Sequence, residues 1–580
     1  MTQVDRSWDI ETDLLVIGAG AAGMTAALVG AIEGLQVILC EKSDMVGGTT
    51  ATSAGTVWIP GSRQGQLGAT PDTVGAARTY LAALLGEHAA DERLDMFLKA
   101  GPAVLEYLEL KTSVRFAAPP VHPDYKQLPG AAIGGRALTA VPFDGRKLGG
   151  DFARVRPPRR EFMVLGGMMV GKADIPALLA PFGNWANFKH VAGLLTRHAL
   201  DRVRYKRGTR LVMGNALVAR LFDSIRRAGV CLRFETALRE IVCDGGNIAG
   251  VVLSSPTGEV AIRASKGVVL ATGGIGWSRE LRQRLLPDAA RRFSLAPSSN
   301  TGDGILAAER INAVIDRDLE SPALWMPSSV MTQPDGYVSV FPHIMLDRAK
   351  PGLLAVNKSG ERFVNEADSY HDFVVAMLGS SASASSATPA FLICDRSFIG
   401  QFGIGLVHAG TKRLKGYLRA NYLIEGETIE ELAQKISIDG EKLAETVERY
   451  NRFADTGVDE DFGRGSSLLN RFNGDPLNKP NPCLRRIGPG PYYAVAVWPS
   501  DLASSAGLRT DSCARVLSRD GKILSGLYAV GTDSSSIFRG TYPGPGTMIG
   551  PAIVFGWCAA MDAAGVMPDL TASCDLRRER

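Results

Sequence analysis

The chain has 580 residues, 45% hydrophobic and 21% charged, with a formal net charge of +4. This composition fits a globular protein of roughly two to four domains, and no apolar run approaches the roughly 20 residues that span a bilayer. The eight cysteines are scattered without a C-x-x-C pair, so we expect neither disulfides nor a zinc site. Met1 to Asp13 is polar and lacks the apolar core of a signal peptide, so we expect a cytoplasmic protein.

The first predicted unit is a strand that runs into a glycine-rich turn. Asp13 to Ile17 leads into Gly18-Ala19-Gly20-Ala21-Ala22-Gly23, and a second strand-like run, Gln36 to Cys40, ends at Glu41. These glycines allow a tight turn, a close approach of pyrophosphate and close helix packing, while the acid can accept hydrogen bonds from a ribose diol. The alternative is a glycine turn without a ligand, but the full succession of elements favours a dinucleotide.

Three later segments belong to the same predicted domain. Gly47 to Gly55 is a loop of small and hydroxyl residues, as a flat cofactor would need. Beyond a predicted helix at Leu217 to Arg227, apolar strands end in glycine turns at Gly267 to Gly274 and at Gly526 to Asp533. Apolar strands that end in glycine turns thus recur at positions hundreds of residues apart in the sequence. This pattern predicts a single sheet interrupted by insertions.

We therefore predict an α/β fold in which a Rossmann-like dinucleotide-binding domain is interrupted by an α+β catalytic (substrate) domain. Residues 1–321 form the first part of the cofactor domain, residues 322–493 the substrate domain and residues 494–580 the second part. Thr428 to Asp455 is charged and amphipathic, which predicts a solvated helix pair.

Residues 151–210 form a basic and apolar insertion in the first part. It contains twelve lysines and arginines against four acidic residues, a local charge of +8, together with Trp185 and Phe188. This combination is typical of a membrane surface, but a solvated basic helix beside a substrate entrance explains it equally well. Nucleic acid is disfavoured because no binding motif accompanies the charge.

Several motifs together resemble a known superfamily. The Gly18 turn, the loop ending at Gly55, Ala271-Thr272-Gly273-Gly274 and Gly531-Thr532-Asp533 resemble the fumarate reductase and succinate dehydrogenase flavoproteins, which implies FAD. Within that superfamily, Asn365-Glu366-Ala367-Asp368-Ser369-Tyr370 and Thr541-Tyr542-Pro543-Gly544-Pro545-Gly546 resemble the 3-ketosteroid Δ1-dehydrogenases, and the similarity covers most of the chain.

This resemblance implies roles for four residues. Tyr370 would be the base that takes the proton from steroid C2, while flavin N5 takes hydride from C1. The Tyr542 hydroxyl and the Gly546 N–H would hold the C3 carbonyl oxygen, and Tyr125 would assist the base. The alternative for each tyrosine is a buried side chain whose hydroxyl only satisfies the backbone.

The resemblance also implies a set of cofactor contacts. Ile549 is included because a helix beginning there would point its N-terminus at the flavin. The residues that we expect at the cofactor are Gly18, Gly20, Ala22, Gly23, Glu41, Lys42, Gly48, Thr49, Thr50, Ser53, Ala54, Gly55, Ala271, Thr272, Gly273, Asp303, Gly531, Thr532, Asp533, Gly546 and Ile549. No histidine stands in an attachment context, so we expect noncovalent FAD.

The expected partners are a 3-ketosteroid and an electron acceptor such as a quinone or dye, with peripheral contact to the inner membrane face. The insertion suggests steroids with a long side chain, as in cholest-4-en-3-one.

Alternative functions are a 3-oxosteroid 4-dehydrogenase, a fumarate or enoate reductase, and a flavin electron carrier without substrate chemistry. Fumarate reduction would need cationic clamps, and we interpret the nearest arginine, Arg362, as part of a surface or domain-closing ion pair. The isolated histidines argue against a hydrolase or a metal site.

Overall fold

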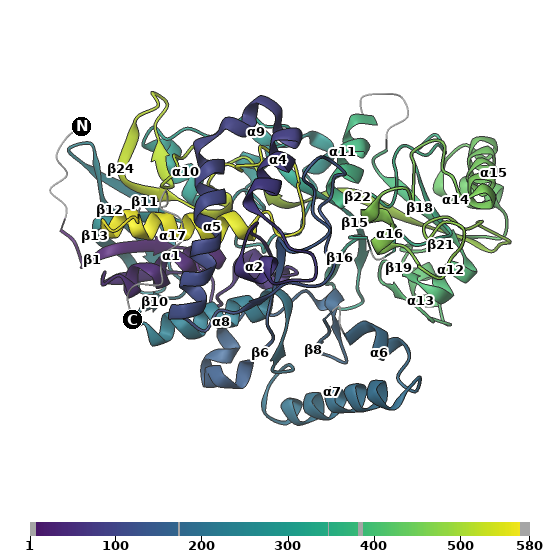
Figure 1. Cartoon of the computed structure of the whole chain (residues 1–580), viewed down its shortest axis with the longest axis horizontal. Coiled ribbons are helices and arrows are strands. Elements are labelled where there is room, and N and C mark those ends of the chain that lie inside the picture. Colours follow the sequence, from purple (N-terminus) through teal and green to yellow (C-terminus); the bar gives the residue numbers. More distant parts are fainter. Residues whose placement is uncertain (1–6, 172–173, 346, 381–386, 569–580) are drawn as a thin grey trace.

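The computed structural model describes residues 7–171, 174–345, 347–380 and 387–568. Parts of the N-terminal polar segment, the basic insertion and the C-terminal segment therefore lie outside the described residues. The described chain folds around an eight-stranded and a seven-stranded sheet (Figure 1). None of its helices is both long and apolar enough to cross a membrane.

The eight-stranded sheet combines distant parts of the chain. In spatial order its strands are β10 (Cys231–Arg233), β2 (Val37–Cys40), β1 (Ile10–Ile17), β13 (Gly258–Leu270), β12 (Asn247–Ser255) and β11 (Ala237–Asp244), with β24 (Ile523–Ala529) beside β13 and β23 (Arg515–Leu517) beside β24. Strands β10, β2, β1, β13 and β24 pair in parallel. This sheet confirms the predicted Rossmann-like domain, in which the three glycine turns follow β1, β13 and β24.

Two apolar helices pack together beside the glycine turn that follows β1. α1 (Ala21–Ile32) and α17 (Ile549–Ala564) consist mainly of small and apolar residues, and most of their side chains are buried. They approach so closely that a Cβ on Gly556 would lie 2.6 Å from the Ala22 carbonyl oxygen. The C-terminal helix thereby closes over the glycine turn that begins the chain's first helix.

The second sheet is mainly antiparallel. Its strands in order are β16 (Val338–Pro342), β15 (Ala323–Thr332), β22 (Tyr492–Ser504), β18 (Ala390–Asp395) and β17 (Leu353–Val356), with β14 (Phe293–Ser294) and β21 (Ile424–Gly426) also beside β22. The predicted helix pair is confirmed as α14 (Ile429–Ile436) and α15 (Gly440–Thr456), which pack on this sheet's outer side. The domain limits at 321 and 493 stay a prediction, since β14 precedes the first limit and β22 crosses the second.

The basic insertion forms a separate arm. It contains the hairpin β7 (Met163–Val164) and β8 (Met168–Met169), the short helix α6 (Ile175–Leu179) and the long helix α7 (Trp185–Arg204). Helix α7 lies at the margin of the molecule, away from both sheets (Figure 1). The arm returns to the cofactor domain at α8 (Met213–Arg227).

A buried ion-pair network joins the segments between the two sheets. Arg136, 1% exposed, precedes β5 (Ala137–Ala140), which pairs with β3 (Thr56–Trp58). Its guanidinium lies 2.7 Å from the Asp72 carboxylate and 2.8 Å from that of Asp124. Because both acids are buried, a single cation compensates two desolvated charges.

Replacing Arg136 with methionine (Arg136→Met) would leave both carboxylates without this cation. We expect the free energy of unfolding to fall by about 3–5 kcal/mol, measured by urea denaturation. Arg146→Met is the matched control, since its pair with Asp144 is solvent-exposed and should contribute far less to stability. Equal losses in the two variants would contradict a stabilising role for this network.

Candidate active site

Three tyrosines from distant segments meet in one buried cluster. The Tyr125 hydroxyl donates to the Tyr370 hydroxyl at 3.0 Å, and the Tyr370 hydroxyl donates to that of Tyr542 at 2.8 Å. These pairs are 245 and 172 residues apart in the chain. All three side chains are at least nine-tenths buried, and the structure therefore assembles the predicted tyrosine set at one point.

Apolar side chains surround the three hydroxyls. The cluster includes Leu295, Leu324, Met326, Val340, Met345, Ala349, Ala367, Leu469 and Cys483. Burial raises the pKa of Tyr542 to about 12 and holds the pKa values of Tyr125 and Tyr370 well above 10. All three tyrosines are therefore neutral phenols at physiological pH.

Tyr370 is held at the start of a helix. It is the first residue of α11 (Tyr370–Ser380), where the Ser369 hydroxyl accepts a hydrogen bond from the Asp372 N–H and donates to its carboxylate. The segment before it is fixed by Glu366, whose buried carboxylate pairs with Arg362 at 2.8 Å and Arg464 at 3.0 Å. These contacts fix the backbone on which the phenol is mounted.

Arg362 forms an ion pair, as interpreted from the sequence, but not on the surface. Its side chain is 3% exposed and also lies 2.8 Å from the Asp459 carboxylate. Two buried acids in separate loops compensate the desolvation of Arg362, which is not a member of the tyrosine cluster. Its donors to Glu366 and Asp459 are thus committed to protein carboxylates.

The segment Tyr542 to Gly546 packs tightly against two neighbours. The Pro543 carbonyl accepts hydrogen bonds from the Tyr125 N–H at 2.9 Å and from the Tyr80 hydroxyl at 2.7 Å. Gly546 has a φ of +97°, and a Cβ there would lie 2.7 Å from the β3 backbone. Only glycine fits this position, which leaves the backbone beside Tyr542 uncovered by any side chain of its own.

Asp124 holds the residue next to it in place. Its carboxylate accepts hydrogen bonds from the Trp58 indole at 2.9 Å, the Ala132 N–H at 2.9 Å and the Arg136 guanidinium. Burial raises the pKa of Asp124 to about 6 in spite of the nearby Arg136. Sequence reasoning did not single out Asp124, because an acid in a loop has no local signature of burial.

The glycines that follow β1 differ in what surrounds them. A Cβ on Gly18 would lie 2.1 Å from the Ala271 carbonyl oxygen, and one on Gly23 would lie 1.9 Å from the Gly18 carbonyl oxygen. A Cβ on Gly20 would instead meet no protein atom within 4 Å, and one on Gly48 would meet only Gly20. No side chain caps α1 at Gly20, so its N-terminus faces an open cradle that fits a pyrophosphate.

Glu41 and Lys42 lie at the other end of this cradle. Glu41 is 8% exposed, and its carboxylate accepts the Ala19 N–H and the Ser43 N–H, each at 2.9 Å. The Lys42 amine lies 2.8 Å from the Asp303 carboxylate, at the start of α10 (Asp303–Arg310). The structure thus brings three predicted cofactor residues together beside the β2 end.

Asp533 joins two predicted glycine turns. It is completely buried, and its carboxylate accepts the Thr272 N–H at 2.5 Å and the Gly274 N–H at 2.9 Å. Asn300, which sequence reasoning missed, donates to the Gly273 carbonyl at 2.8 Å and to the Thr49 hydroxyl at 3.2 Å. Its position just before Thr301-Gly302-Asp303-Gly304 is a signal that could have indicated it.

The remaining predicted cofactor residues line the same region. Thr50 accepts a hydrogen bond from the Ala21 N–H at the α1 N-terminus. Gly531 lines a small cavity of about 20 Å³, and Ile549 is the first residue of α17, whose first turn borders that cavity. The other members, on α1, in the loop from α2 (Gly48–Thr52) to β3, and after β13 and β24, are Ala22, Ser53, Ala54, Gly55, Ala271 and Thr532.

A strap from the insertion crosses between the two domains and was also missed. The Arg156 guanidinium donates to the Ser43 hydroxyl at 2.9 Å, beside Glu41. The Arg159 guanidinium donates to the carbonyls of Leu295 and Val340, at 3.1 and 2.9 Å, behind two members of the tyrosine cluster. Residues 156–159 therefore tie the cofactor cradle to the apolar cluster.

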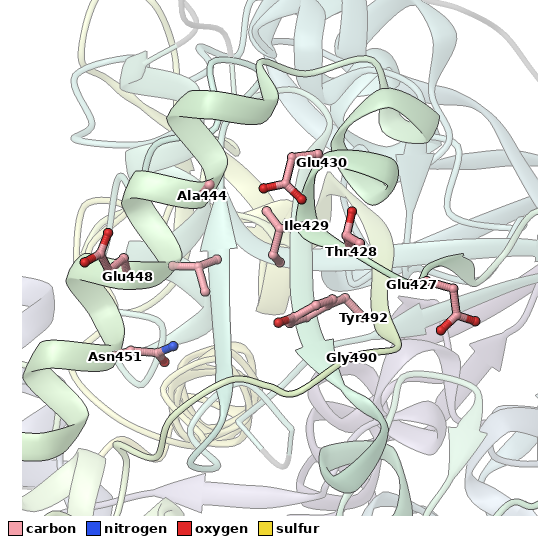
Figure 2. A pocket seen from close by; sticks show the side chains of 10 residues that line it. Glu427, Thr428, Ile429, Glu430, Ala444, Glu448, Asn451, Gly490 and Tyr492 are labelled. Atoms are coloured by element: carbon pink, nitrogen blue, oxygen red, sulfur yellow. The ribbon is translucent and has the colours of Figure 1, made fainter.

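A surface hollow lies elsewhere. Figure 2 shows it between the start of α14 and the side of α15, with a volume of about 310 Å³. Carboxylates of Glu427, Glu430 and Glu448 and the Tyr492 ring border it, and none of the predicted site residues does. Among the described residues, no group of three or more histidine, cysteine or acidic side chains could hold a metal ion.

Known proteins resemble this chain along almost its whole length. The family described as FAD binding domain matches residues 13–549. The 3-oxosteroid 1-dehydrogenase of Mycobacterium tuberculosis is 36% identical over 96% of this chain and 98% of its own. The 4-oxocyclohex-2-ene-1-carboxylate 5-dehydrogenase of Sinomonas cyclohexanicum is 37% identical over 97% of this chain and 95% of its own.

A crystal structure shows the same architecture. The 3-ketosteroid Δ1-dehydrogenase of Sterolibacterium denitrificans, in complex with 1,4-androstadiene-3,17-dione, is 34% identical with a TM-score of 0.89. The match covers 96% of this chain and all of that one. The fold class predicted from the sequence is therefore confirmed.

The two cradle glycines should respond differently to alanine. Gly23→Ala forces a Cβ into the Gly18 carbonyl, so we expect the apoprotein to lose about 1–3 kcal/mol of unfolding free energy. Gly20→Ala meets no protein atom, so the apoprotein should keep its stability while its affinity for added FAD falls at least about tenfold. Urea denaturation and FAD titration measure the two effects, and wild-type FAD affinity in Gly20→Ala would contradict the assignment of the cradle.

His371 should make the protein acid-sensitive. Burial lowers its pKa to about 4, so the unfolded chain, with a histidine pKa of about 6.5, binds the proton more readily. The free energy of unfolding should thus fall by about 3 kcal/mol as pH drops from about 6.5 to 4. His371→Asn should flatten this slope in urea denaturation at several pH values, whereas exposed His408→Asn should leave it unchanged. An identical slope in the two variants would assign the acid sensitivity to other groups.

Proposed function

Because the chain belongs to the FAD-binding family of 3-oxosteroid 1-dehydrogenases, we propose that it removes hydrogens from C1 and C2 of a 3-ketosteroid. The family and enzyme class predicted from the sequence are confirmed; the steroid and the residue roles are the proposal. The observation that carries it is the row of three hydrogen-bonded tyrosine hydroxyls inside an apolar cluster.

FAD, held noncovalently, would supply the hydride acceptor at its N5 atom. The α1 N-terminus, Gly20 and Gly48 would receive the pyrophosphate, and Glu41 would accept hydrogen bonds from the ribose. The Asp533 contacts would keep the β13 and β24 turns in register beside it. Acid precipitation should release the flavin into the supernatant, and retention on the protein would contradict noncovalent binding.

Tyr370 would take the C2 proton. Since burial keeps it a neutral phenol, it must lose its own proton as it gains the new one. Its hydroxyl already donates to Tyr542, so its proton can move there while Tyr542 protonates the substrate's carbonyl oxygen. Once C1 has lost its hydride, the enol oxygen would release this proton back along the row of tyrosine hydroxyls to solvent, and the ketone would re-form. Tyr125 donates to the Tyr370 oxygen and would stabilise the negative charge that develops on it. In this arrangement no buried phenolate has to exist before the steroid binds.

Tyr542 and Gly546 would hold the C3 carbonyl oxygen. A phenol and a backbone N–H directed at one oxygen stabilise the charge that develops as the ketone becomes an enol. Gly546 suits this role because the β3 backbone fixes it and it has no side chain. The neutral His371 ring lies 6.0 Å from the Tyr542 ring and adds no charge that would compete for the carbonyl.

The apolar cluster favours a polycyclic substrate over a small charged one. The similarity to the Sinomonas enzyme makes a 4-oxocyclohexane-type carboxylate the second candidate. A carboxylate needs a cation or several donors when it leaves water, and the cluster around the tyrosines offers apolar side chains. A fumarate reductase would similarly need free cations, whereas Arg362 is paired with two acids. The electron acceptor would be a quinone or, in the test tube, a dye.

An anaerobic titration tests this function. The flavin-loaded protein would be mixed with androst-4-ene-3,17-dione, cholest-4-en-3-one or 4-oxocyclohexanecarboxylate, and flavin absorbance and product mass followed. We expect a steroid to bleach the flavin and to emerge lighter by two hydrogen atoms, desaturated at C1–C2. If only the carboxylate bleached the flavin, the substrate would be a cyclohexanone acid and not a steroid. Desaturation of the steroid at C4–C5 would indicate a 4-dehydrogenase.

Tyr370→Phe provides the control for the base. It keeps the ring in its apolar surroundings but removes the hydroxyl, so the bleaching rate should fall on the order of 10²–10⁴-fold with FAD retained. Tyr107→Phe, which removes a hydroxyl bonded to Glu33 far from the cluster, should leave the rate unchanged. A wild-type rate in Tyr370→Phe would contradict its role, and reoxidation of reduced flavin by an enoate would favour a reductase.

A further inference from the structure

Helix α7 presents its apolar side chains outward. Trp185, Leu200 and Val203 are 67%, 69% and 87% exposed, and Phe188 and Leu195 are also exposed. At 100° per residue, these positions share one side of the helix, while the buried residues Leu194, His198 and Asp201 occupy the other. A helix of a globular protein normally buries its apolar stripe, so this helix is inverted.

An aromatic group stands at the start of this face. Phe182, 84% exposed, precedes the helix, and its ring centroid lies 6.2 Å from that of Phe188. The Phe188 ring stacks on Trp185 at 5.3 Å, and the Lys189 amine lies 5.7 Å from the Trp185 ring. Aromatic rings with a neighbouring lysine suit the boundary between water and lipid, where the rings enter and the amine stays hydrated.

The insertion's arginines are mostly committed to the protein itself. Arg159 binds two carbonyls, Arg197 lies 3.0 Å from Asp144, Arg210 lies 3.0 Å from Asp174, and Arg207 donates to Asn215. The local charge of +8 therefore overstates the positive charge that is free to attract a binding partner. Apolar area, and not charge, is the main feature that α7 offers to a partner.

We propose that α7 and Phe182 dock on the surface of a lipid bilayer, with the helix lying in the interface and held mainly by apolar contact. The face has the composition of an interfacial helix, and α7 is not apolar enough to cross the membrane. The margin position of α7 leaves this face clear of both sheets (Figure 1). A few exposed cations, such as Lys189 and Arg204, add a minor attraction for anionic headgroups.

The same arm touches the apolar cluster around the tyrosines. It begins at the strap in which Arg159 holds the carbonyls of Leu295 and Val340. Docking would therefore place this cluster close to the phase in which an apolar ketone dissolves. That consequence depends on the proposed steroid substrate, whereas the docking itself does not.

Vesicle sedimentation of the flavin-loaded protein tests the docking. We expect binding to phosphatidylcholine vesicles alone, a modest gain on adding phosphatidylglycerol, and little loss in high salt. The variant Phe182→Ser/Trp185→Ser/Phe188→Ser should bind at least about a hundredfold more weakly, because it loses the three exposed aromatic rings that would enter the lipid. Lys189→Gln/Arg204→Gln should lower binding only a few-fold.

The matched control is Leu67→Ser/Leu110→Ser/Leu477→Ser, which removes three apolar side chains elsewhere that are each more than two-thirds exposed, and it should bind like wild type. Turnover of androst-4-ene-3,17-dione in detergent-free solution should be unchanged in every variant, which separates lost docking from a damaged fold. Wild-type binding by the aromatic variant would overturn the proposal. So would a wild-type dimer that the aromatic variant converts to a monomer in light scattering, since the face would then join two copies of the chain.

Discussion

The proposed active site depends on the contacts of one buried carboxylate, Asp124. It binds the Trp58 indole on β3 and the Arg136 guanidinium beside β5, while the next residue, Tyr125, donates its N–H to Pro543. Since Gly546 packs on β3 as well, the strand that supports Asp124 also supports the segment carrying Tyr542. Three stretches of chain thereby become one rigid unit, and the relative positions of Tyr125 and Tyr542 follow from it.

Burial imposes the chemistry of the tyrosines. Removing three phenols from water makes each a poor acid, so no one of them can wait as a charged base. Hydrogen bonding in a row offers another solution, because a proton gained at one oxygen can be matched by a proton lost to the next. In the proposed mechanism, the apolar wall that suits a polycyclic ketone and the neutral row of hydroxyls that would act on it have the same physical origin.

The basic and apolar residues of the insertion lie in two different parts of it. Its first residues form a strap whose arginines bind Ser43 on the cofactor side and two carbonyls on the substrate side. Its last helix exposes aromatic and aliphatic residues at the margin of the molecule. The arginines of the strap therefore point into the protein and join its domains, whereas the apolar side chains of α7 face solvent. A surface segment usually has the reverse arrangement.

The sequence by itself determined the cofactor fold, because glycine turns after apolar strands are local signals with a steric cause. Gly18 and Gly23 are required by contacts within the turn and with the next strand end, and such requirements are visible as short motifs. The tyrosine set could be named only through family resemblance, since Tyr125, Tyr370 and Tyr542 lie hundreds of residues apart. Only the tertiary structure decided that their hydroxyls touch, that Arg362 is buried between two acids, and that Asp124, Asn300 and the Arg156–Arg159 strap support the site. It also decided that the apolar side of α7 faces outward, because hydrophobic periodicity gives a helix its stripe but does not specify which way the stripe points.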